Sequence, residues 1–91
     1  MGTTFQDAAA RGRFELEEDG KLVFADYRRR DGMLVITHVE ADPALRGKGA
    51  AGRLMEELTK IARRDGLKLR PFCSYAAAWL RRHREHQDLL G

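Results

Sequence analysis

The side chains best suited to acid–base chemistry are a histidine and a glutamate two positions apart, His38 and Glu40. They lie in the segment from Met33 to Ala41, whose β-branched residues predict a strand. Because side chains alternate along a strand, the two share one face and lie ~6.6 Å apart. A histidine can act as a general base near neutral pH, and a buried glutamate can do the same. A surface or sheet-edge contact between the two is the alternative interpretation.

The single cysteine, Cys73, precedes a predicted helix that runs from Tyr75 to about His83. A thiol at the start of a helix can be a nucleophile that accepts an acyl group covalently. Tyr75 can donate a proton to a leaving thiolate. The alternative roles are structural: a small buried residue for Cys73 and a packed ring for Tyr75, as we expect for Trp79.

A basic, glycine-rich turn follows the predicted strand and leads directly into an amphipathic segment. Glycines permit positive φ angles and a close approach of the backbone to a ligand. Free N–H groups at a helix N-terminus bind phosphate groups, and neighbouring cations add to that attraction. We therefore expect a pyrophosphate site here, with a tight strand-to-helix connection that binds nothing as the alternative. Its residues are Arg46, Gly47, Lys48, Gly49, Ala50 and Ala51.

The end of the preceding strand offers a second binding feature. Asp42 and Pro43 break the strand, and Val39 and Ala41 lie on the face opposite His38. Where two parallel strands separate at such a break, backbone N–H and C=O groups remain exposed. An extended, amide-containing ligand such as pantetheine can pair with them as an added strand. An ordinary strand end is the alternative.

The residues before this turn predict a three-stranded antiparallel meander. Apolar and polar residues alternate from Arg13 onward, as in a half-buried strand. Asp-Gly pairs at 19–20 and 31–32 separate the strands, and this dipeptide is a strong hairpin signal.

After the turn, the apolar period becomes that of a helix from about Gly49 to Asp65, with Gly66 as a left-handed cap. Leu67 to Cys73 predicts a strand that ends or bulges at Pro71. The helical crossover makes this strand parallel to the third. The predicted fold class is α/β (α+β), a mixed sheet in the order β-β-β-loop-α-β-α. The apolar stripe of the first helix consists of Leu54, Met55, Leu58, Ile61 and Ala62.

Length and composition indicate one domain over residues 1–91, with 43% hydrophobic and 34% charged residues. No uninterrupted apolar run reaches the ~18 residues of a membrane span. Residues 1–10 lack the charged start and apolar centre of a signal peptide. One cysteine excludes an internal disulfide. We therefore expect a cytosolic protein that does not enter a membrane.

The formal net charge of +3 favours an anionic partner. The basic runs at 28–30 and 81–82 raise the alternative of a small nucleic-acid-binding domain, but solvated faces explain them better because no recognition motif accompanies them. His83 and His86 are three positions apart without an evident third ligand, so we expect no metal site. The segment that contains them, residues 83–91, either docks on the core or frays.

Four of these elements, in this order, resemble a small, minimal subfamily of the GNAT superfamily of N-acetyltransferases. The likeness extends from Phe14 to Leu90. The loop departs from the usual pattern, because Ala50-Ala51 stands where Ile-Gly is more common. The matching elements are His38-Val39-Glu40-Ala41, the loop Pro43 to Gly49, Pro71-Phe72-Cys73, and a closing segment from Trp79 to Leu90.

The resemblance implies a splayed sheet that binds acetyl-coenzyme A. It places the pyrophosphate on Arg46 to Ala51 and the pantetheine beside Val39 to Ala41, with the thiol end toward His38, Glu40 and Cys73. The helices that wall the acceptor site of larger relatives have no counterpart among the predicted elements. We therefore expect an open acceptor groove, or one that a partner completes.

These observations lead to an acetyl-coenzyme A-dependent N-acetyltransferase with an unidentified amine acceptor. In a direct mechanism, His38 or Glu40 deprotonates the amine; in a covalent one, Cys73 first receives the acyl group. A module that binds the cofactor without turnover is the main alternative. The sequence does not determine the oligomeric state.

Overall fold

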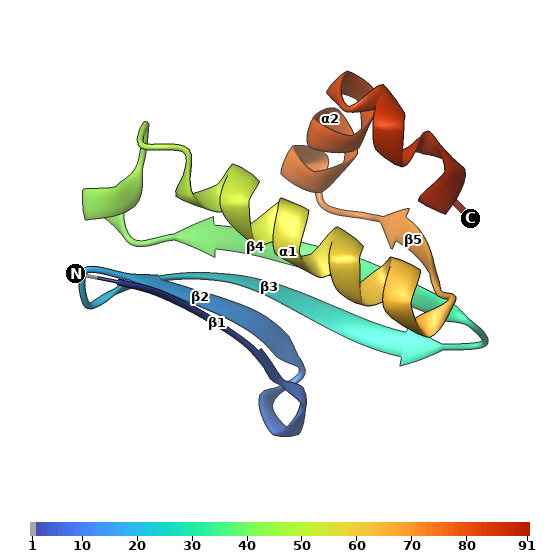
Figure 1. The fold of residues 1–91 in the computed structure, drawn as a ribbon, viewed down its shortest axis with the longest axis horizontal. Helices are drawn as coiled ribbons and strands as arrows, with labels where there is room; N and C mark the ends of the chain where they lie inside the picture. Colours follow the sequence, from blue (N-terminus) through green and yellow to red (C-terminus); the bar gives the residue numbers. More distant parts are fainter. Residues whose placement is uncertain (1) are drawn as a thin grey trace.

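The computed structural model describes residues 2–91, which form one five-stranded sheet with helices packed against it. Figure 1 shows the long helix α1 crossing the sheet and α2 beside it, above β5. The strands follow chain order across the sheet, from β1 to β5. The elements are β1 (Thr3–Ala8), η1 (Ala9–Arg11), β2 (Arg13–Glu18), β3 (Lys21–Arg30), β4 (Met33–Ala41), η2 (Pro43–Leu45), α1 (Ala50–Asp65), β5 (Lys68–Pro71), α2 (Ser74–Arg82) and η3 (Arg84–Leu89).

The predicted sheet topology is confirmed. Strands β2, β3 and β4 form an antiparallel meander, and β5 lies parallel to β4 after the crossover through α1. Asp19 and Gly20 both have positive φ, 52° and 76°, as a two-residue type I′ hairpin requires. Asp31 and Gly32 repeat this geometry at 51° and 77°.

Strand β1 was not expected. It pairs antiparallel with β2, from Thr3 opposite Glu18 to Ala8 opposite Arg13. Only Phe5 and Ala8 are partly buried, so the segment lacks the alternation of apolar and polar residues that signals a strand. Its pairing with β2 decides its conformation.

Helix α1 covers the sheet with the predicted stripe. Leu54, Met55, Leu58 and Ala62 are fully buried, whereas Ile61 is only half-buried at the edge of the core. Gly66 caps the helix with φ 67°, and its N–H is directed at the carbonyls of Ala62 and Arg63. The single hydrophobic core therefore lies between α1, α2 and one face of the sheet.

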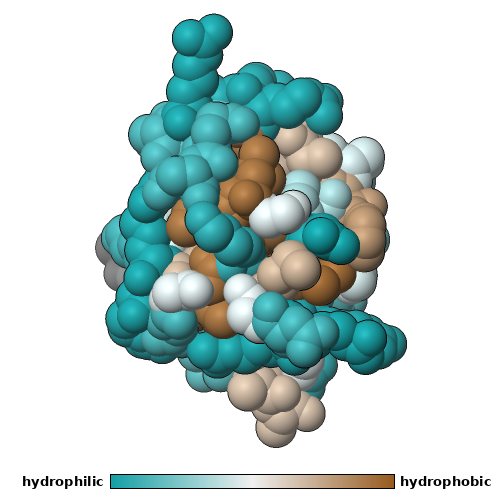
Figure 2. Space-filling model, turned by 90° about the vertical axis from the view of Figure 1, so that its right-hand side faces the viewer, coloured by the Kyte–Doolittle hydropathy of each residue, from teal (hydrophilic) through white to brown (hydrophobic). Residues whose placement is uncertain are grey.

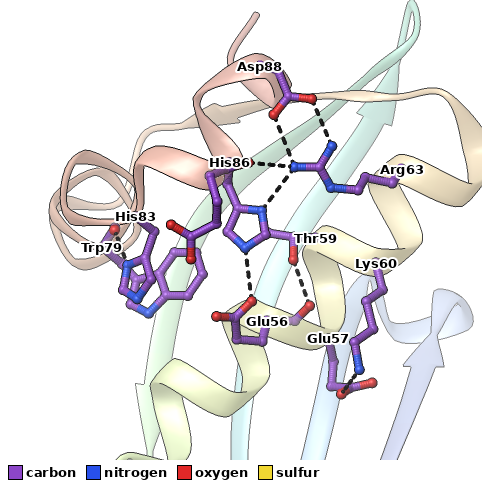
Figure 3. A network of polar contacts seen from close by, with 10 residues as sticks. Glu56, Glu57, Thr59, Lys60, Arg63, Trp79, His83, His86 and Asp88 are labelled. Atoms are coloured by element: carbon purple, nitrogen blue, oxygen red, sulfur yellow. Dashed lines mark hydrogen bonds and ion pairs between the residues drawn. The ribbon is translucent and has the colours of Figure 1, made fainter.

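The C-terminal segment docks on the core, one of the two outcomes left open by its sequence. Figure 3 shows Arg63 of α1 donating hydrogen bonds of 2.7 and 3.0 Å to the two carboxylate oxygens of Asp88. Arg63 also donates to Nδ1 of His86 (3.1 Å). A guanidinium only donates, so the proton of His86 resides on Nε2, which donates to Glu56 at 2.9 Å. Leu89 is thereby held in the core.

This segment closes the end of the molecule on the right of Figure 1. Figure 2 views that end, where hydrophilic residues surround a smaller hydrophobic area near its centre. Within residues 2–91, no helix combines the length and apolar character that crossing a membrane requires.

Because Leu58 of α1 is fully buried in the core, Leu58→Ala should lower the free energy of unfolding by about 2–5 kcal/mol. Chemical denaturation measures this change. Phe72→Ala is the matched control: its ring is 70% exposed, so its removal should alter stability by no more than about 0.5 kcal/mol. Equal losses in the two variants would contradict the assignment of the core.

Candidate functional site

Strands β4 and β5 separate halfway along β4. Parallel pairing joins Met33–Ile36 to Lys68–Pro71, and β4 then continues to Ala41 without β5. The paired region ends at Ile36, whose carbonyl accepts hydrogen bonds from both the Phe72 N–H (2.9 Å) and the Cys73 N–H (3.2 Å). The separation thus begins at Ile36, earlier than the break at Asp42 and Pro43 at which the sequence placed it.

A register shift in β4 accompanies the separation. Ile36 lies opposite Tyr27 and His38 lies opposite Asp26, so Thr37 is an extra residue in the ladder. Such a bulge bends its strand and increases the local twist. On the other strand, Pro71 has no N–H to continue a ladder. The bulge at Thr37 and Pro71 together account for the divergence.

The separation leaves backbone groups of β4 directed into the gap. The Asp42 N–H donates to the Leu22 carbonyl of β3 at 2.8 Å. Because alternate residues direct their N–H and C=O groups to opposite sides of a strand, His38 and Glu40 pair with β3. The backbone groups of Val39 and Ala41 therefore face the side that β5 has left. These are the two positions that the sequence analysis selected for pairing with an extended ligand.

The glycine-rich loop presents some of its amides and uses others internally. The Arg46 N–H bonds to the Pro43 carbonyl (3.3 Å) and the Lys48 N–H to the Leu45 carbonyl (3.2 Å). The row of free amides expected at 46–51 is therefore interrupted at both cationic residues, because the loop forms tight turns there. The side chains of Arg46 and Lys48 remain exposed.

The remaining amides of the loop lie at the N-terminus of α1. Among the described residues, none of the N–H groups of Gly47, Gly49, Ala50 and Ala51 donates to a protein acceptor, and the first helical bond runs from the Arg53 N–H to the Gly49 carbonyl. The first N–H groups of a helix carry partial positive charge. This stretch of backbone can accept an anion.

Arg53, which the sequence analysis did not select, holds this loop in place. Its guanidinium donates to both carboxylate oxygens of Glu18 at 2.6 and 2.7 Å, and to the Lys48 carbonyl at 2.9 Å. The hydrogen bonds from Arg53 lower the pKa of the Glu18 carboxyl, although partial burial opposes this effect. A side chain on Gly49 would begin 3.1 Å from the Arg53 guanidinium, so glycine also provides space there.

His38 and Glu40 form the expected pair on the exposed face of β4. Nε2 of His38 lies 2.9 Å from Oε1 of Glu40, and the His38 ring lies 6.2 Å from that of Phe24. The two side chains are 53% and 57% exposed, so the burial on which a base at Glu40 depends is absent. Glu40 is placed to orient His38.

Cys73 and Tyr75 lie on the other side of the gap. Cys73 is half-buried at the N-cap of α2. Its backbone N–H donates a hydrogen bond to the Ile36 carbonyl, which places Cys73 beside the segment that leads into His38. Burial raises the pKa of the Tyr75 phenol, which keeps it protonated. Its hydroxyl lies 3.9 Å from the place where a Gly52 side chain would begin, in the first turns of α1.

Two contributors to this arrangement were missed in the sequence: Gly52 and the bulge at Thr37. Trp79 Nε1 lies 3.4 Å from the position of a Gly52 Cβ, so the glycine permits close packing of α2 on α1. A glycine inside a helix is unfavourable, and this could have indicated a close approach. No residue pattern marked the bulge.

The two histidines of the C-terminal segment are engaged with protein groups. His83 stacks on Trp79 at 3.8 Å, and its Nδ1 lies 2.7 Å from the Trp79 carbonyl. The structure also brings ligand atoms of Glu56, His83 and Glu85 within 4.8 Å of one another, a grouping that the sequence analysis did not consider.

Comparison with known protein families identifies the class to which this fold and loop belong. The family model of the GCN5-related N-acetyl-transferases matches residues 13–89. The chain therefore belongs to the GNAT-related N-acetyltransferase family. A search of curated proteins gave no match.

The pair formed by Glu18 and Arg53 should make the stability of the fold depend on pH. Because the folded-state pKa of Glu18 is lowered, its contribution is complete above the unfolded-state value near 4.5 and is lost as pH falls through the folded-state value. Glu18→Gln should thus lower the thermal midpoint at pH 7, with the difference from the unmodified protein vanishing at acid pH.

Thermal unfolding followed by circular dichroism between pH 3 and pH 7 measures this difference. Glu17→Gln is the control, since the Glu17 side chain is exposed and makes no hydrogen bond within residues 2–91. A constant gap between the Glu18→Gln variant and the unmodified protein over the whole range would contradict the pairing.

Proposed function

We propose that the protein is a minimal N-acetyltransferase that binds acetyl-coenzyme A between β4 and β5. The main support is the early separation of these strands, with the backbone groups of Val39 and Ala41 directed into the gap. An extended pantetheine chain carries amide groups that complement such a strand edge. Family membership favours the same ligand.

The loop before α1 supports this assignment at the other end of the ligand. The amides of Gly47, Gly49 and Ala51 and the positive end of the helix suit a diphosphate, with Arg46 and Lys48 as additional cations. The gap and the loop adjoin one another, because η2 and the loop connect the end of β4 directly to α1. One elongated, anionic ligand can therefore contact both.

In the proposed mechanism, His38 acts as general base toward the acceptor amine, and Glu40 orients its ring through the 2.9 Å contact. Acetyl-coenzyme A supplies the activated acetyl group as a thioester. The amine nitrogen bonds to the acetyl carbon as the bond from carbon to sulfur breaks, and His38 takes the amine proton. A backbone N–H of β4 polarises the carbonyl, and protonated Tyr75 donates to the departing thiolate. In the alternative route, Cys73 accepts the acetyl group first.

Isothermal titration with acetyl-coenzyme A tests the binding step. We expect saturable heat, with affinity about thirtyfold lower after Arg46→Gln and Lys48→Gln together, since each loses roughly 1 kcal/mol of attraction to phosphate. The control pair Arg81→Gln and Arg84→Gln removes the same charge from exposed positions outside the loop. Absence of heat with the unmodified protein would refute the proposal.

Two substitutions separate the direct route from the covalent one. His38→Gln should lower kcat by roughly 10²–10⁴-fold, because it removes the base, whereas Cys73→Ala should change kcat by only a few fold. Mass spectrometry of the acetylated amine measures both. Loss of turnover in Cys73→Ala, with an acetyl adduct on the intact unmodified protein, would instead establish the covalent route. Tight cofactor binding without acetylation of any amine would favour the module that binds without turnover.

A further inference from the structure

A groove of about 420 Å³ lies on the face of the sheet opposite α1. Its apolar part consists of Met33, Val35 and Phe72, from β4 and from the residue after β5. Phe72 is 70% exposed, so its ring presents an apolar surface to solvent. Pockets of this volume suit small ligands or short peptide segments.

The charged lining of the groove is predominantly basic. Arg28 and Arg30 reach it from β3 and Arg70 from β5, against the single carboxylate of Asp31. Within residues 2–91, none of these three guanidinium groups forms a side-chain hydrogen bond or an ion pair with a carboxylate. By contrast, the six arginines that do pair with carboxylates are Arg11, Arg13, Arg29, Arg53, Arg63 and Arg64.

The groove adjoins the proposed reacting groups. Thr37 lines it and immediately precedes His38, and Phe72 lines it and immediately precedes Cys73. The amides of Phe72 and Cys73 both bond to the Ile36 carbonyl, which joins the two segments at this end of the groove. The bulge leaves Thr37 and His38 both exposed.

We propose that this groove binds the acceptor, and that the acceptor is a primary amine that also carries carboxylates. This inference rests on the proposed function, since it specifies the substrate of that site. Unpaired guanidinium groups bind carboxylates in bidentate geometry, and Phe72, Met33 and Val35 contact the aliphatic part of the ligand. The amine is then directed toward Thr37 and the neighbouring His38.

A nucleic acid is a less suitable occupant of this surface. Arg29 of the basic run 28–30 pairs with Asp65 at 2.8 Å, so that run does not present three free cations. Arg28, Arg30 and Arg70 instead converge on one small groove that also contains a carboxylate. Recognition of a phosphate backbone uses an extended series of cations along a strand or duplex.

Nuclear magnetic resonance titration of the full ¹⁵N-labelled chain tests the site without requiring turnover. The probes are the C-terminally amidated tripeptides Ala-Asp-Asp, Ala-Asn-Asn and Ala-Lys-Lys, and free glutamate. We expect Ala-Asp-Asp to shift the Val35 and Phe72 amides and to bind at least about tenfold more tightly than Ala-Asn-Asn. A response to glutamate alone would identify a free amino acid, rather than a peptide, as the source of the carboxylates.

The variant Arg28→Gln with Arg70→Gln should weaken Ala-Asp-Asp binding by about tenfold and raise the acceptor KM with little change in kcat. Arg81→Gln with Arg84→Gln, which carries the same loss of charge outside the groove, should leave binding unchanged. A reduction in kcat with unchanged KM would overturn the assignment, because it would place the arginines in the chemical step.

Acetyl-coenzyme A added to the same samples separates the two proposals. If it shifts the Gly47 and Gly49 amides but no acidic probe shifts the groove, the substrate assignment fails and the proposed function stands. If acetyl-coenzyme A produces no shifts, both the proposed function and the substrate assignment fail, whatever the groove binds. Tighter, salt-sensitive binding of an oligothymidylate at the groove would overturn the assignment in favour of a nucleic acid.

Discussion

The divergence of β4 and β5 is the constraint on which the rest of this structure depends. The parallel ladder ends at Ile36 and Pro71, yet β4 runs five further residues to Ala41. An open strand edge presents backbone N–H and C=O groups that water or another group can pair with. Here the open edge faces the N-terminus of α2, and β4 leads on to the N-terminus of α1. The proposed ligand path therefore continues from the strand to the helix.

Ion pairs between residues far apart in the sequence hold α1 against the other elements. The bidentate contact from Arg53 to Glu18 joins α1 to the β2–β3 hairpin, and the bond from Arg53 to the Lys48 carbonyl positions the loop between them. At the opposite end of α1, Arg63 holds η3 through Asp88 and His86. The helix is therefore anchored at both ends, which fixes its N-terminus relative to the sheet.

The two faces of the sheet have separate roles. One face is covered by α1 and contains the buried residues of β2, β3 and β4, which supply the core. The other face presents His38, Glu40 and the basic groove without a covering helix among residues 2–91. Stability thus comes from one face, while His38, Glu40 and the groove proposed for acceptor binding lie on the other. Cys73 and Tyr75 pack against the core.

Local signals in the sequence were sufficient to predict the meander, the helix α1 and the parallel crossover. Asp-Gly turns, the apolar stripe and Gly66 each act over a few residues. They also placed His38 beside Glu40, since alternation along a strand is a local property. Strand β1 depends on its pairing with β2. The bulge at Thr37 depends on the register of β4 against β3. The contact from Arg53 to Glu18 depends on packing between residues 35 positions apart. The gap and the groove arise from such long-range pairings, which only the tertiary structure decided.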